Sequence, residues 1–126
     1  MAKVFFVMLG GSLGALSRYT TTLVAVRLFG TWFPFGTLIV NLSGCLLIGL
    51  SFALVERHFA PMSANAYLFF VTGYLGSLTT FSTFALETVS SVRAGSRRVP
   101  VMNFLCNNLF GAALVLLGMW IGGLSF

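Results

Sequence analysis

The chain has 126 residues, of which 58% are hydrophobic and 7% are charged, and its formal net charge is +5 at pH 7. So much apolar surface excludes a single water-soluble domain, and a lipid bilayer is the expected solvent. The seven Lys and Arg residues are too few and too scattered for a nucleic-acid interface. We therefore expect lipid, and not nucleic acid, around this protein.

Four apolar stretches follow one another, at residues 4–26, 35–55, 66–92 and 101–124. Each reaches the roughly 20 residues that a helix needs to cross a hydrocarbon core of about 30 Å. The segments that connect them are short. The pattern predicts an all-α, multi-pass integral membrane protein with one domain, residues 1–126, and four transmembrane helices.

The first span contains two glycines in a G-x-x-x-G pattern, Gly10 and Gly14, and a cation, Arg18. Glycines one turn apart let a second backbone approach closely, so we expect close helix packing there. Arg18 lies roughly 20 Å along the helix from Val4, near the membrane interface and not at the bilayer midplane. Its side chain either reaches the lipid headgroups or forms a cationic vestibule for an anion.

Side-chain amides occur in the second and fourth spans. Asn41 stands early in the second span, where an amide in hydrocarbon requires hydrogen-bond partners. It either bonds a neighbouring helix or donates hydrogen bonds along a permeation path. In the fourth span Asn103 and Asn107 are four residues apart and share a helix face, which predicts a polar stripe over half of that span.

The third span contains the most unusual stretch, residues 73–87, in which seven of fifteen residues are Gly, Ser or Thr. The hydroxyl groups within residues 79–83 compete for backbone hydrogen bonds, and the pattern predicts a helix break there. A break exposes amides that can bind an anion and carbonyls that can bind a cation. Phe81 and Phe84 remain neighbours, and the positive edges of their rings can contact an anion weakly.

Three ordered blocks resemble the small fluoride channels of the CrcB family, also called Fluc, and they read GGSLGALSRY, GTLIVNLSGCLLIG and GYLGSLTTFSTFALE. The resemblance covers essentially the whole chain. It implies a fluoride-selective channel in the plasma membrane, the inner membrane of bacteria, that lets fluoride leave the cytoplasm passively and so confers fluoride resistance. It also implies an antiparallel, dual-topology homodimer with two pores.

The resemblance further implies roles for individual residues along a fluoride path and at the dimer centre. By similarity, the path is lined by Asn41, Phe81, Ser82, Thr83, Phe84 and Asn107, Arg18 belongs to the vestibule, and the backbone carbonyls of Gly76 and Thr79 from each chain hold a structural sodium ion. The fourth span departs from the family pattern. Gly111 and Val115 stand where many relatives have Ser and Thr.

A proton-coupled exporter of the small multidrug type is the alternative function, because such exporters also have four short spans. It would use Glu87, the carboxylate within the third span. An enzyme is not expected, since the spans contain no ordered pair of nucleophile and base.

The charges at the ends of the spans give a modest orientation signal. With the N-terminus in the cytoplasm, Lys3 and Arg57 would be cytoplasmic and four arginines would be outside, so the positive-inside rule favours the opposite orientation. These four are Arg27, Arg93, Arg97 and Arg98. Charge alone leaves dual insertion open, and the resemblance is what implies it.

Overall fold

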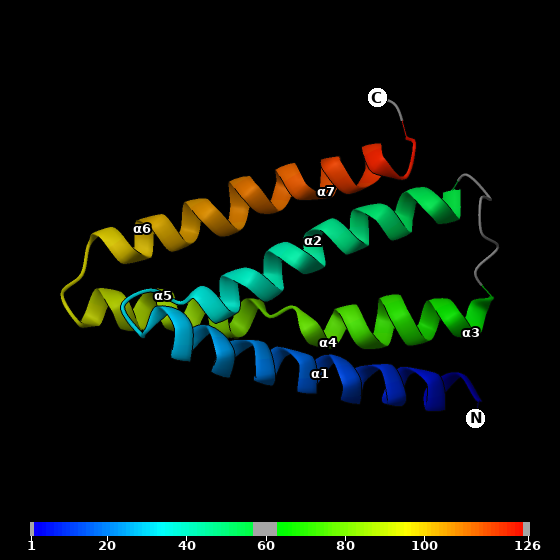
Figure 1. Cartoon of the computed structure of the whole chain (residues 1–126), viewed down its shortest axis with the longest axis horizontal. Coiled ribbons are helices and arrows are strands. Elements are labelled where there is room, and N and C mark those ends of the chain that lie inside the picture. Colours follow the sequence, from blue (N-terminus) through cyan, green and yellow to red (C-terminus); the bar gives the residue numbers. More distant parts are fainter. Residues whose placement is uncertain (1, 57–62, 125–126) are drawn as a thin grey trace.

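The computed structural model describes residues 2–56 and 63–124, and the regular elements of this part are helices arranged as four rods (Figure 1). The all-α prediction is confirmed. The first rod is α1 (Ala2–Phe29), and the second is α2 (Phe35–Glu56). The third rod contains α3 (Ala64–Tyr67), the π-helical η1 (Leu68–Leu75), α4 (Gly76–Leu78) and α5 (Phe81–Arg93). The fourth contains α6 (Arg98–Leu105), the π-helical η2 (Cys106–Phe110) and α7 (Gly111–Ile121).

Three of the rods are long and apolar enough to cross a membrane, namely Phe35–Glu56, Ala64–Arg93 and Arg98–Ile121. At 28 residues α1 is also long enough, but Arg18 and the neighbouring Ser and Thr residues make it less apolar. The four predicted rods are thus present, and length and composition mark three of them as membrane spans.

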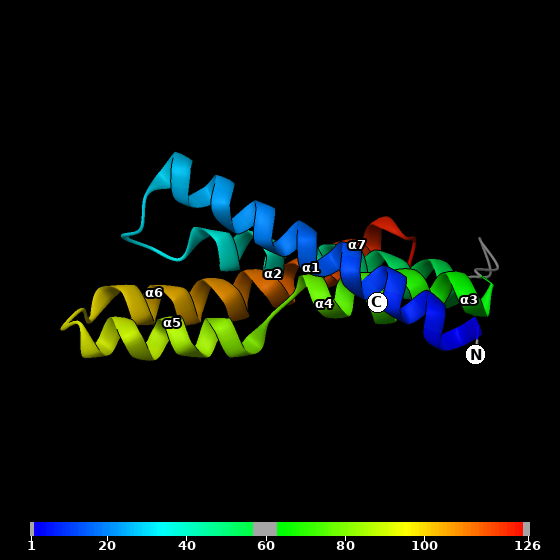
Figure 2. The same cartoon turned by 90° about the horizontal axis from the view of Figure 1, so that it is seen from below.

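The third rod is interrupted at Thr79 and Thr80, where the backbone is extended (Figure 2). Thr79 has φ −78° and ψ 155°, and Thr80 has φ −153° and ψ 116°. The predicted break is confirmed, but it is narrower than residues 79–83. It ends at Phe81 because the Thr80 hydroxyl accepts a hydrogen bond from the N–H of Thr83, and so caps the N-terminus of α5.

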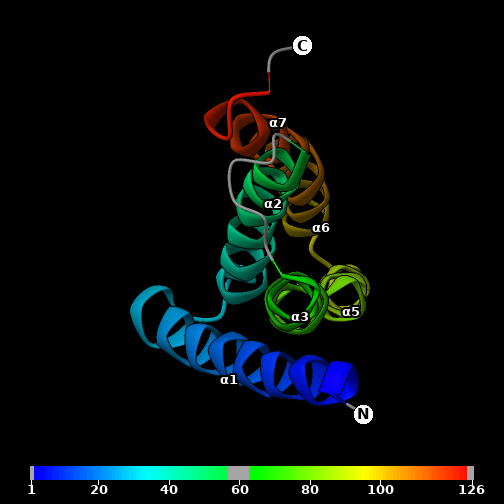
Figure 3. The ribbon, with the colours of Figure 1, turned by 90° about the vertical axis from the view of Figure 1, so that its right-hand side faces the viewer.

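Seen from one end, the rods lie side by side (Figure 3), and some of their backbones approach closely. The first rod lies against the third, α2 lies against α7, and α5 lies against α6. A Cβ atom at Gly10 would meet the carbonyl of Phe69, and one at Gly14 would meet the carbonyl of Tyr74. Both glycines are buried, so the close approach predicted from the G-x-x-x-G pattern is confirmed.

Four arginines lie at one end of the bundle, where α1 ends and where α5 turns into α6 (Figure 1). Lys3, near the start of α1, lies at the opposite end. Arg57, which was predicted to lie on the same side of the membrane as Lys3, is outside the described residues. Among the described residues the cations are therefore distributed unequally between the two ends.

Gly10→Ala tests the packing of the first rod against the third. The new methyl group would overlap the carbonyl of Phe69, so we expect the free energy of unfolding in detergent to fall by about 1–3 kcal/mol. Gly11→Ala is the matched control, because a Cβ atom there meets nothing within 4 Å. The control should leave stability unchanged or raise it by roughly 0.5–1 kcal/mol. Equal effects of the two substitutions would contradict the packing.

Candidate functional site

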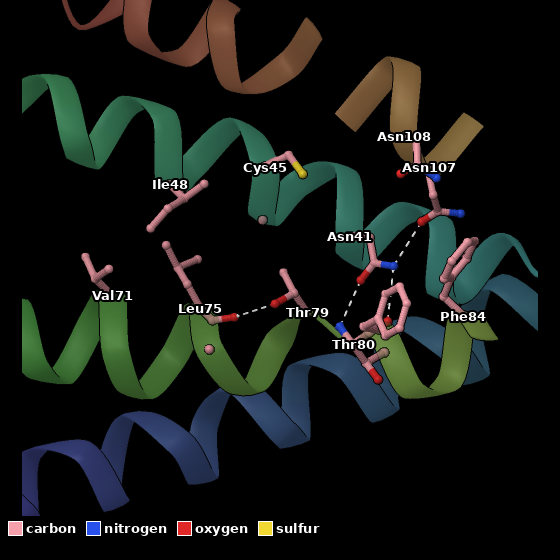
Figure 4. Close-up of a pocket in the computed structure, with 13 residues that line it drawn as sticks. Asn41, Cys45, Ile48, Val71, Leu75, Thr79, Thr80, Phe84, Asn107 and Asn108 are labelled. Atoms are coloured by element: carbon pink, nitrogen blue, oxygen red, sulfur yellow. Dashed lines mark hydrogen bonds between the residues drawn. The ribbon is translucent and has the colours of Figure 1, made fainter. Parts of the chain in front are cut away.

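An open groove of about 420 Å³ lies between α2 and the interrupted third rod, and α5 and η2 complete its walls (Figure 4). It brings together the predicted site residues Asn41, Gly76, Thr79, Phe81, Phe84 and Asn107. The remaining lining residues are Gly44, Cys45, Ile48, Val71, Leu75, Thr80 and Asn108. The groove is therefore polar at the break and apolar along α2 and η1.

Asn41 of α2 pairs with the extended backbone of Thr80 (Figure 4). Its Oδ1 accepts a hydrogen bond from the Thr80 N–H at 2.9 Å, and its Nδ2 donates one to the Thr80 carbonyl at 3.3 Å. The amide thus supplies the acceptor that the Thr80 N–H loses when the helix is interrupted, and adds a second bond to the Thr80 carbonyl. This contact fits the interhelical role that was one of the two interpretations of Asn41.

The break also deprives the carbonyls of residues 76–79 of their helical donors, Gly76 and Thr79 among them. In a continuous helix Gly76 would accept from the N–H of Thr80, and Thr79 from the N–H of Thr83. The Thr80 N–H instead bonds Asn41, and the Thr83 N–H bonds the Thr80 hydroxyl at 3.2 Å. Both residues line the groove, and carbonyls exposed at a helix break are groups that can bind a cation.

Three asparagines and a threonine form a hydrogen-bonded row behind the groove. Asn41 Nδ2 donates to Asn107 Oδ1, Asn107 Nδ2 donates to Asn103 Oδ1, and Asn103 Nδ2 donates to Thr88 Oγ1, each at 2.9 Å. Asn103 is completely buried. The shared face of Asn103 and Asn107 is confirmed, and the row connects α2, the fourth rod and α5.

Three residues of this arrangement, Thr80, Thr88 and Asn103, were not predicted as site residues from the sequence. A Thr directly before a helix is a cap signal, and it could have singled out Thr80. Asn103 stands one turn before Asn107 on the same helix face, which was also a usable signal. Thr88 has no local signal, because its partner Asn103 belongs to another rod.

The two phenylalanines of the break are neighbours, as predicted, with ring centroids 5.6 Å apart and ring planes at 48°. Their surroundings differ. Both line the open groove, but Phe84 is 7% exposed whereas Phe81 is 79% exposed. Ser82 and Thr83 do not line the groove, and their hydroxyls lie 3.2 Å and 3.1 Å from the Thr80 hydroxyl.

Glu87 lies on α5 outside the lining of the groove. Its Oε1 accepts a hydrogen bond from the hydroxyl of Thr37 on α2 at 2.8 Å. Its Oε2 is buried and has no hydrogen-bond partner among the described residues. The carboxyl group therefore connects α5 to α2 through one oxygen.

Residues 5–119 match the family described as CrcB-like protein, Camphor Resistance (CrcB). The chain belongs to this family. It is 40% identical over 120 residues to a protein of Acidobacterium capsulatum named fluoride-specific ion channel FluC, with 95% of each chain covered. It is 39% identical over 126 residues to the protein of that name from Dehalococcoides mccartyi, covering 98% of this chain and 95% of the relative. The protein of that name from Shewanella amazonensis is 41% identical over 118 residues, with 94% of each chain covered.

In this CrcB chain the remaining predicted positions lie away from the groove. Arg18 is half-buried on α1 and does not line the groove. A Cβ atom at Gly111 would lie 3.3 Å from the sulfur of Cys45 on α2. The carbonyl of Val115 on α7 lies against Gly49 of α2. The two departures from the family pattern therefore fall in the packing between α2 and α7.

Asn41→Leu tests the pairing with Thr80 in this CrcB chain. It leaves the N–H of Thr80 without an acceptor and removes one of the bonds to the Thr80 carbonyl, so we expect the free energy of unfolding in detergent to fall by about 1–3 kcal/mol. Hydrogen exchange of the Thr80 amide should become faster. Ser43→Ala is the control, because this exposed hydroxyl bonds only its own helix. Unchanged protection of the Thr80 amide in Asn41→Leu would contradict the pairing.

Proposed function

We propose that this chain is a fluoride-selective ion channel that lets fluoride leave the cytoplasm passively across the plasma membrane. The observation that carries the proposal is the identity of about 40%, over nearly the whole chain, to proteins named fluoride-specific ion channel. These relatives are named as channels, so the proposed activity is conduction and not catalysis. The groove beside the break supports the proposal through the chemistry of its lining.

Fluoride is small and strongly hydrated, so its path has to replace water with closely spaced hydrogen-bond donors. The lining of the groove offers the N–H groups of Asn41 and the rings of Phe81 and Phe84, and Asn107, which also lines the path, accepts from Asn41. In the part of the chain that the structure describes, none of the residues that line the groove is Lys or Arg. Amides and ring edges attract an anion less strongly than a fixed cation does, which lets the ion leave again. Ser82 and Thr83 extend the polar path from Thr80, and Arg18 belongs to its vestibule.

The proposed channel is an antiparallel homodimer with two pores. The groove is open on one face of the chain, and Phe81 beside it is 79% exposed. An exposed aromatic ring beside a polar groove favours a protein partner over lipid. A second copy in the opposite orientation would cover this face and place its own four-arginine end beside the less charged end of the first.

A structural sodium ion at the dimer centre would be held by the carbonyls of Gly76 and Thr79 from both copies. When bound, it would neutralise the negative carbonyl ends of the two interrupted helices. Two features of the chain support this assignment. Both carbonyls have lost their helical donors, and Gly76 is exposed on the open face.

The exporter alternative requires Glu87 in the transport path. Glu87 does not line the groove, and one of its oxygens is engaged by Thr37. The position of this carboxyl group therefore favours a channel that works without coupling to protons.

Flux from liposomes tests the proposed function. Purified protein should release fluoride down its gradient and essentially exclude chloride, because only the smaller ion fits closely spaced donors. A fluoride-selective electrode and a chloride electrode measure the two fluxes in parallel. Liposomes without protein are the control. Equal fluxes of the two ions, or fluoride release that strictly requires a proton gradient, would refute the channel.

Phe81→Ile and Phe84→Ile test the aromatic part of the path. Each substitution removes a ring edge that contacts the anion, so we expect fluoride flux to fall by about tenfold, or roughly 1.4 kcal/mol in the barrier. Phe5→Ile on α1 is the matched control, since Phe5 is exposed and remote from the groove. Size-exclusion chromatography should show the same dimer for all three. Unaltered flux in both ring variants would remove the rings from the path.

A further inference from the structure

A directed row of hydrogen bonds begins and ends on backbone groups of the third rod. The row starts at the N–H of Thr80 and ends at the carbonyl of Phe84. Between them it passes through side chains of three rods, in the order Asn41, Asn107, Asn103 and Thr88. Because a backbone N–H can only donate and a carbonyl can only accept, both ends have fixed roles.

The two ends determine how the outer side chains are turned. The Thr80 N–H lies 2.9 Å from Asn41, so the atom of Asn41 that receives it is the oxygen. At the other end the Thr88 hydroxyl lies 2.7 Å from the Phe84 carbonyl and donates its only proton there. Thr88 can therefore only accept from Asn103, and this amide turns its Nδ2 to Thr88.

The middle of the row follows from its ends. Asn103 has Oδ1 left to offer, and it receives Nδ2 of Asn107, which also bonds the Asn103 carbonyl at 3.0 Å. Asn107 then presents Oδ1 to Asn41. If any of the three amides were flipped, two donors or two acceptors would face each other. Each amide therefore has one satisfied orientation.

Both N–H groups of Asn107 are engaged within its own rod, so this residue offers an oxygen and not a donor to its neighbour. Asn41 is different. One of its N–H groups goes to Asn107 at 2.9 Å, and the other goes to the Thr80 carbonyl outside the row, at 3.3 Å, which is longer than any contact within the row. The N–H at the longer contact is the one that an anion in the groove can take over at the lowest cost.

We propose that Asn103 and Thr88 are positioning residues for fluoride passage. They hold Asn107, and through it they keep the amide nitrogen of Asn41 at the groove and its oxygen against Thr80. Asn103 is 0% exposed and cannot contact the ion, so its effect is transmitted through Asn107. The inference rests on the proposed fluoride conduction and adds two residues outside the lining of the groove.

Thr88→Val and Thr88→Ser provide the test in liposomes. Valine keeps the shape of the side chain and removes the hydroxyl, whereas serine keeps the hydroxyl. The fraction of vesicles that release fluoride measures how many channels are folded, and the release rate measures conduction by each. We expect Thr88→Val to lower the rate about tenfold, or roughly 1.4 kcal/mol, with an unchanged fraction, and Thr88→Ser to keep the wild-type rate.

Asn103→Leu and the double variant with Thr88→Val extend the test. If the two residues act as one unit, the double variant should lose no more rate than either single variant. Thr20→Val is the matched control, because this hydroxyl makes the same kind of bond to the carbonyl four residues earlier, on α1. Side-chain amide exchange of Asn41, measured by NMR, should become faster in Thr88→Val and stay unchanged in the control.

Three results would overturn the proposal while the wild type still conducts fluoride. These are an unchanged rate in Thr88→Val, an equal loss in Thr88→Ser, and a lower vesicle fraction with an unchanged rate, which would mark a purely structural role. A wild-type chain that passes no fluoride would overturn the proposed function itself, and this inference with it.

Discussion

The pairing of one side-chain amide with one extended backbone residue is the contact on which the rest of the structure depends. In hydrocarbon, each unsatisfied backbone group costs several kcal/mol, so a helix cannot stop there without other partners. Asn41 provides two for Thr80, at 2.9 Å and 3.3 Å. This contact helps the third rod to be interrupted, with α4 ending at Leu78 and α5 beginning at Phe81.

The interruption brings two helix ends of opposite character next to each other. The C-terminal end of α4 presents carbonyls, and the N-terminal end of α5 presents N–H groups, so the local field changes sign within a few residues. Hydroxyls and amides surround the N-terminal side, where Thr80 bonds Thr83 and Asn41. A single short break can therefore offer surroundings for ions of both signs, and an unbroken helix cannot.

Sequence patterns predicted the features that are local in the chain. The hydroxyl cluster predicted the break, the glycine spacing predicted the close approach of α1, and the four-residue spacing of Asn103 and Asn107 predicted their common face. Patterns could not predict pairings between distant rods, such as Thr37 with Glu87, which are 50 residues apart. Such pairings depend on the axial register of two helices.

The different exposure of Phe81 and Phe84 was also beyond local reasoning. Three residues apart, they are equivalent in any helical pattern. Their burial depends on how α5 is rotated about its axis after the break, where α5 packs against α6 and α2. Helix rotation is therefore the quantity that the sequence patterns lacked.

The positions of the partners along the chain have a consequence for membrane insertion. Asn41 precedes Thr80 by 39 residues, so the second span has already been synthesised when the extended residues of the third span emerge. Asn107 follows Asn41 by 66 residues and arrives only with the fourth span. The extended backbone of Thr80 can thus be satisfied by a side chain that is synthesised before it, and the fourth span then completes the row of amides that begins with Asn41.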